Sequence, residues 1–192
     1  MTVLNIKKIG KTITYLLVSI LLISCSTDIS TYKNKAPVFD IKQYFNGEMI
    51  AWGMIQDYSS KVTRRFCVEL AANWQQEQGT LAETFYFDDG EISYRTWNLI
   101  KQGAGKYSGT AEDVIGVASG QQSGFAFQWQ YTLSVPIDDT VYQFEMDEWM
   151  YQIDQYRVFN RTSMSKLGIK VAEITLFFDK GQQQKQCQNP AS

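Results

Sequence analysis

The stretch Phe125–Val135, FAFQWQYTLSV, carries an apolar side chain at every odd position and a polar one at nearly every even position. Successive side chains of a strand point to opposite faces, so this pattern predicts a β-strand with one buried and one solvated face. The same alternation recurs in three other stretches: Val62, Phe66, Val68 and Leu70; Leu81, Phe85 and Phe87; Ile169, Val171 and Phe177.

Turn-forming residues separate these runs at short intervals. Asp88-Asp89-Gly90 lies between two alternating runs and indicates a hairpin. Residues 45–179 contain about nine or ten such runs and almost no helical periodicity. A sheet of that size without covering helices must curl or split. Sequential hairpins favour an all-β fold, a single antiparallel up-and-down barrel of about 9–10 strands. Charges on the apolar faces favour a soluble barrel over one embedded in the outer membrane.

The N-terminus has the features of a bacterial lipoprotein signal. Lys7, Lys8 and Lys11 precede an apolar run over 13–23 that is too short to span a bilayer. The sequence Leu-Ile-Ser-Cys that follows resembles a lipobox, so we expect Cys25 to be lipidated. Ser26, rather than Asp, then favours the outer membrane, on its periplasmic face. The expected organisation is a signal peptide over 1–24, a lipidated tether over 25–37, a barrel domain over 38–180 and a disordered tail over 181–192.

Composition excludes several function classes. The chain has 18 basic and 20 acidic side chains, and a signal peptide would remove three lysines and no acid. An acidic surface argues against nucleic acid as a partner. The sequence contains no histidine, which removes Ser-His-Asp and Cys-His catalysis, the usual zinc sites and common haem ligation. We therefore expect no metal and no cofactor.

Two cysteines remain after lipidation of Cys25. An oxidising compartment would permit a disulfide between Cys67 and Cys187. However, Cys187 lies in a Gln-rich tail, GQQQKQCQNPAS. The simpler expectation is therefore a buried Cys67 and a free Cys187.

Several longer stretches resemble a known family. YFNGEMIAWG, FYFDDGEISYRTW, GKYSGTAEDVIGVASG and DEWMYQIDQYRVFNRTSMSKLGIKVAEITLFF together are similar to an uncharacterised family of proteobacterial lipoproteins, a domain of unknown function. The resemblance covers about residues 38–179. It implies a lipoprotein signal and a lipocalin-like or calycin-like barrel, with no established activity. Members are often encoded beside fatty-acid-modifying enzymes, which points towards lipids by association only.

Charged or polar side chains that share a face with apolar ones are the candidate ligand-binding residues. Two interpretations stay open: an internal salt-bridged network, with Arg64 expected to pair with Glu83, or a ligand site in which Arg95 beside Trp97 meets a carboxylate or phosphate. Aromatic side chains could line an apolar pocket or simply fill the barrel. The candidates are Arg64, Glu83, Arg95, Trp97, Trp129, Asn160 and Glu173.

Three functions follow from these features. The first is a membrane-anchored periplasmic lipoprotein whose barrel binds or passes an apolar, acyl-chain-like ligand such as a fatty acid or lipid. The alternative is a structural or interaction lipoprotein of the envelope with a packed barrel and no ligand. An enzyme that acts on lipids, with Glu83 or Asp147 as acid or base, is less expected because histidine is missing. No catalytic residue is assigned.

Overall fold

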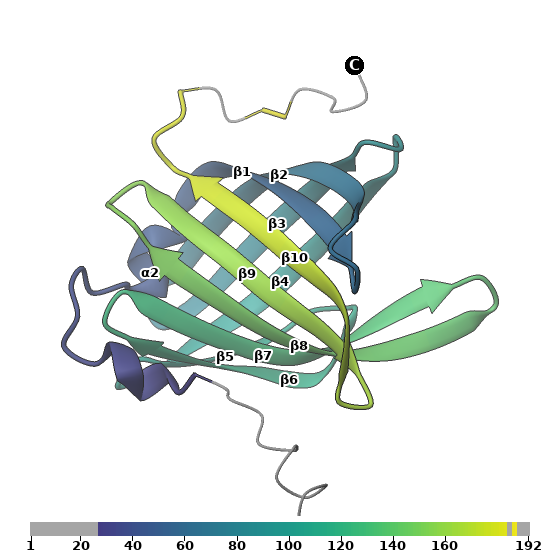
Figure 1. The fold of residues 1–192 in the computed structure, drawn as a ribbon. Coiled ribbons are helices and arrows are strands. Elements are labelled where there is room, and N and C mark those ends of the chain that lie inside the picture. Colours follow the sequence, from purple (N-terminus) through teal and green to yellow (C-terminus); the bar gives the residue numbers. More distant parts are fainter. Residues whose placement is uncertain (1–26, 184–185, 188–192) are drawn as a thin grey trace, which may run out of the picture.

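Ten antiparallel strands form a closed barrel in the computed structural model, which describes residues 27–183 and 186–187 (Figure 1). Each strand pairs with its neighbours in sequence, and β1 pairs with β10 to close the sheet. The strands are β1 (Gly47–Asp57), β2 (Val62–Gln75), β3 (Gln78–Phe87), β4 (Ile92–Gly103), β5 (Lys106–Thr110), β6 (Val114–Ser123), β7 (Ala126–Ile137), β8 (Thr140–Gln152), β9 (Arg157–Lys166) and β10 (Ile169–Asp179).

The predicted fold class is confirmed. The alternating stretch that begins at Phe125 forms β7, and its odd-numbered side chains from Phe127 to Val135 face the interior. Asp88-Asp89-Gly90 forms the β3–β4 hairpin, with Gly90 at a φ of 89°. Left-handed φ values favour glycine, which explains its place in this turn.

One end of the barrel is closed by a plug, residues 39–45, which contains the short helix α2 (Ile41–Tyr44). Phe39, Tyr44 and Phe45 are almost fully buried, and the ring of Tyr44 packs edge-on against both phenylalanines. Trp74 Nε1 donates to the Phe45 carbonyl at 2.7 Å, and Tyr44 Oη donates to the Tyr156 carbonyl at 2.8 Å. The plug is therefore attached both to β2 and to the turn between β8 and β9.

The opposite end carries the β7–β8 hairpin, which projects beyond the neighbouring strands (Figure 1). The pairing of β7 with β6 reaches Leu133, and that of β8 with β9 reaches Glu145. The hairpin continues to the Ile137–Thr140 pair without a strand on either side. Neither helix of the described chain covers this end, which we call the mouth.

The N-terminal segment before the plug packs against the outside of the barrel. The short 3-10 helix η1 (Ile29–Tyr32) contacts β6 and β7. The ring of Tyr32 meets those of Phe125, Trp149 and Tyr151 at centroid distances of 5.1 to 6.1 Å. The described residues 27–37 of the predicted tether thus follow the barrel surface, while the predicted signal peptide and Cys25 lie outside the described residues.

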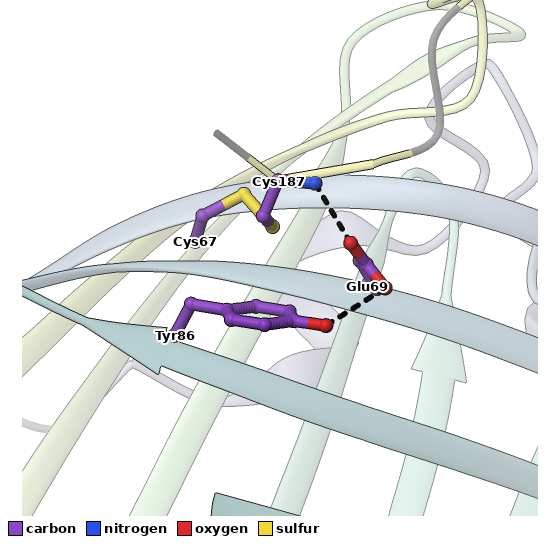
Figure 2. The surroundings of a disulfide bond; sticks show 4 residues. All are labelled: Cys67, Glu69, Tyr86 and Cys187. Atoms are coloured by element: carbon purple, nitrogen blue, oxygen red, sulfur yellow. Dashed lines mark hydrogen bonds between the residues drawn. A yellow bond between two sulfur atoms is a disulfide. The ribbon is translucent and has the colours of Figure 1, made fainter. Parts of the chain in front are cut away.

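Near the C-terminus, Cys187 is joined to Cys67 of β2 by a disulfide (Figure 2). The expectation of a free Cys187 was wrong. The backbone N–H of Cys187 also donates to Glu69 at 2.8 Å, and Glu69 accepts a second hydrogen bond from Tyr86 at 3.2 Å. The sequence pattern did not indicate this contact because Cys67 and Cys187 are 120 residues apart in the chain.

The plug yields a test of stability. Phe39 is 0% exposed, whereas the adjacent Val38 is 71% exposed. Phe39→Ala should lower the free energy of unfolding by about 3–5 kcal/mol because it leaves a cavity under α2. Val38→Ala, the control, should stay within about 0.5 kcal/mol of the parent chain. Urea unfolding followed by tryptophan fluorescence measures both, and equal effects would show that the plug does not stabilise the barrel.

Candidate functional site

The barrel encloses a cavity of about 410 Å³ between the plug and the mouth. Its wall is mostly apolar and aromatic. Phe45 and Phe178 line it at the plug end, and Val135 and Pro136 of the projecting hairpin line it at the mouth. A volume in this range is typical of small-molecule sites, which are roughly 300–1,000 Å³.

Three aromatic residues lie in mutual contact on the cavity wall. The ring centroid of Trp97 lies 5.5 Å from that of Trp129 and 5.3 Å from that of Tyr131, both edge-on. Gly109 and Gly120 leave the space that Trp129 occupies, since a Cβ at either position would lie within 3.0 Å of its indole ring. These glycines therefore position Trp129 by close approach.

A polar cluster lies among these apolar groups, made up of Glu83, Arg95, Asp113, Tyr131, Glu148 and Asn160. Arg95 faces Glu83 across the β3–β4 pairing. Its guanidinium binds Asp113 through Nη2 at 2.7 Å and through Nε at 2.9 and 3.1 Å. Arg95 is thus already engaged by a carboxylate of the protein.

Glu148 lies on β8 and accepts hydrogen bonds from two neighbours. Asn160, which is 1% exposed, donates to one carboxylate oxygen, and Tyr131 donates to the other at 3.4 Å. Thr162 in turn donates to the Asn160 carbonyl oxygen at 3.0 Å, which orients its amide group. Burial, with the nearby negative charge of Glu83, raises the pKa of Glu148 to about 7 against the opposing effect of Arg95.

Glu83 lies on β3 and has an environment of the same kind. Burial is the main cause that raises its pKa to about 7. The positive charge of Arg95 opposes this rise, and the negative charge of Asp113 contributes to it. A hydrogen bond from Trp97 opposes the shift. The second carboxylate oxygen, Oε2, is buried and has no hydrogen-bond donor among residues 27–183 and 186–187.

The structure brings together five of the predicted ligand-binding residues: Glu83, Arg95, Trp97, Trp129 and Asn160. We had expected Arg64 to pair with Glu83, but it does not. Its guanidinium binds Asp89 at 2.8 Å and Glu91 at 3.0 Å in the β3–β4 hairpin and stacks on Phe87. The register explains the error because Glu83 lies opposite Leu70, far along β2 from Arg64.

Glu173 was also misplaced. It faces outward, where it binds Arg161 at 2.8 Å and also Lys170. The inward side chains of β10 are Ile174, Leu176 and Phe178, so the even positions face the cavity. Both faces of β10 carry apolar side chains, because Phe177 belongs to an outer aromatic cluster with Trp52 and Phe159. The sequence pattern therefore did not show which face of β10 lines the cavity.

Sequence reasoning missed Glu148, Tyr131 and Asp113. Glu148 shares a face with Phe144, Met146 and Met150, the same signal that selected Glu83. Asp113 lies in the β5–β6 turn, and no periodicity marks it. Asp147, proposed as an alternative acid or base, bonds instead to Gln128 and to Trp149 Nε1 on the outer face.

No group of three or more metal-ligating side chains occurs in the described part of the chain. Nor does any helix there have the length and hydrophobicity to cross a membrane.

A family model described as "Protein of unknown function (DUF3833)" matches residues 19–180. The chain belongs to the DUF3833 family. No curated protein matches it. Among solved structures it is similar to an S-type phycobiliprotein lyase, CPES, from Guillardia theta, with a TM-score of 0.55 and 8% sequence identity. The alignment covers 76% of this chain and 95% of the lyase, so the two proteins share a fold.

The raised pKa values of the two glutamates predict how stability depends on pH. Their side chains have an ordinary pKa near 4.5 in the unfolded chain and about 7 in the barrel. The folded state therefore binds more protons between pH 4.5 and 7, and stability falls as pH rises through this window. Glu83→Gln removes one of the two groups, so it should raise the melting temperature at pH 8 and change it little at pH 5.

The control for this experiment is Glu145→Gln, which alters an exposed position on β8. Its melting temperature should follow that of the parent chain at both pH values. A Glu83→Gln variant that is less stable than the parent at pH 8 would contradict the assigned environment of Glu83.

Proposed function

We propose that this DUF3833 protein binds an apolar small molecule, with an acyl-chain-like body, inside its barrel. The observation that carries the proposal is the 410 Å³ cavity, lined by aromatic and aliphatic side chains and reaching the mouth. Burying apolar ligand surface there is favourable by about 25 cal/mol per Å² before the costs of association. The alternative of a packed barrel without a ligand does not account for this space.

The named relative supports a ligand-binding role only by its fold. A phycobiliprotein lyase uses the same barrel architecture, and barrel interiors and mouths are common places for small-molecule sites. Because the sequence identity is only 8%, the ligand must be inferred from this chain's own cavity. Its large apolar wall and small polar cluster fit an amphiphile whose tail packs against aromatic groups.

Binding can be tested with Nile red, an uncharged apolar dye whose fluorescence rises in an apolar site. We expect saturable binding to the parent protein. Ile174→Trp places an indole in the cavity and should weaken binding by about tenfold or more. Val117→Trp, at a position 68% exposed, is the matched control and should bind as the parent does. Equal binding by both variants would place the dye outside the barrel.

We also propose that Cys25 is acylated and holds the barrel at the outer membrane, on the periplasmic face. The basic, apolar and Leu-Ile-Ser-Cys segments in succession support this. Two or more acyl chains would make the anchor stable, since each buried methylene contributes about 0.8 kcal/mol.

In cells fed an alkyne-labelled fatty acid, the protein should carry the label and sediment with membranes. Cys25→Ala should abolish the label, while Cys187→Ala should retain it. Label that persists in Cys25→Ala would refute acylation at Cys25.

A further inference from the structure

The charged groups of the cavity do not balance. Four charged side chains line it: Glu83, Asp113 and Glu148 are acidic, and Arg95 alone is basic. Arg95 holds Asp113 through contacts of 2.7 to 3.1 Å. When both glutamates are ionised, the cavity therefore carries excess negative charge in a poorly solvated place, which is unfavourable unless a cation joins it.

The hydrogen bonding of the two glutamates points to where such a cation would bind. Both oxygens of Glu148 accept hydrogen bonds, from Asn160 and Tyr131. The Oε2 atom of Glu83 is buried and accepts none from the described chain. An unpaired buried acceptor costs about 1–3 kcal/mol, and more when it is charged. Glu83 is thus the incompletely hydrogen-bonded carboxylate on the cavity wall, at the place where negative charge is in excess.

We propose that the cavity selects an amphiphile that ends in a protonated amine, which donates a hydrogen bond to the carboxylate of Glu83. This inference rests on the proposed function and names the head group of its ligand. The ammonium charge would offset that of Glu83 and Glu148 together. The apolar tail would lie against Trp97 and Trp129.

The same arrangement disfavours an anionic head group. A carboxylate or phosphate would meet three acidic side chains, and Arg95 could bind it only by releasing Asp113. The earlier expectation of an Arg95–carboxylate contact is therefore replaced. A neutral hydroxyl could donate one hydrogen bond to Glu83 but would leave the charge uncompensated, so it should bind with intermediate strength.

Three probes with the same ten-carbon tail separate these cases: decylamine, 1-decanol and decanoate. Each is titrated against bound Nile red at pH 7.5. We expect decylamine to displace the dye at concentrations about tenfold lower than 1-decanol, and decanoate to be the weakest. Decanoate or 1-decanol binding as tightly as decylamine would overturn the amine proposal, while the apolar site would stand. Failure of the dye and all three probes to bind would overturn the proposed function itself.

A variant tests the assigned contact. Glu83→Gln should weaken decylamine binding by about tenfold and leave 1-decanol and Nile red binding within about twofold. Glu145→Gln should change none of them. Unchanged decylamine affinity in Glu83→Gln would show that Glu83 does not bind the amine, and an equal loss for all ligands would assign it a structural role only.

The affinity for decylamine should also depend on pH. The groups that face Glu83 inside the barrel are Arg95, Asp113, Tyr131 and Glu148. Lowering the pH from 8 to 5.5 protonates the two glutamates, so decylamine affinity should fall while 1-decanol affinity stays nearly constant. A decylamine affinity that is constant over this range would contradict the proposal.

Discussion

The pairing of β1 with β10 is the constraint on which the interior depends. Eight residue pairs, from Ile50–Asp179 to Asp57–Ala172, join the first strand to the last. Closure satisfies both edges of the sheet and turns one face of every strand towards a common interior. Ten strands enclose more space than their inward side chains occupy, so the plug fills one end and a cavity remains behind it.

Within that cavity the chain keeps polar groups that a packed core would not contain. Asn160 and Thr162 are nearly inaccessible and form a chain of hydrogen bonds to Glu148, while Asp113 neutralises Arg95. These bonds satisfy most of the buried polar atoms. Glu83 is the exception among the charged residues that line the cavity: its Oε2 atom is buried without a hydrogen-bond donor from the described residues. Unsatisfied buried groups of this kind call for an explanation in terms of function.

Much of the fold could be predicted because alternation reports burial directly. The odd-numbered residues from Phe127 to Val135 face the interior as the pattern indicates, and Glu83, Arg95 and Asn160 lie inside for the same reason. Alternation fails where both faces are apolar. On β10 the outer Phe177 packs with Trp52 and Phe159, so its face was taken for the buried one and Glu173, on the same face, was assigned to the interior.

The partners of side chains that meet far apart in the sequence could not be predicted. Arg64 meets Asp89 and Glu91 in the neighbouring β3–β4 hairpin, and Cys67 on β2 meets Cys187, 120 residues further along the chain. Such contacts depend on register and on chain path, which a periodic pattern does not encode. Asp113 belongs to the same class, since it reaches Arg95 from a turn.

The attachment of the plug to the end of the chain has a consequence for the order of folding. Tyr44 bonds to carbonyls of Tyr156 and Phe178, and Lys180 bonds to the Tyr44 carbonyl, across sequence separations of 112 to 136 residues. The disulfide adds a link across 120 residues. Contacts of such range form slowly because the intervening chain must first be ordered. The plug is synthesised before any of the ten strands, yet its final contacts form only after the last strand is complete. Closing this end of the barrel is therefore a late event that requires the entire domain.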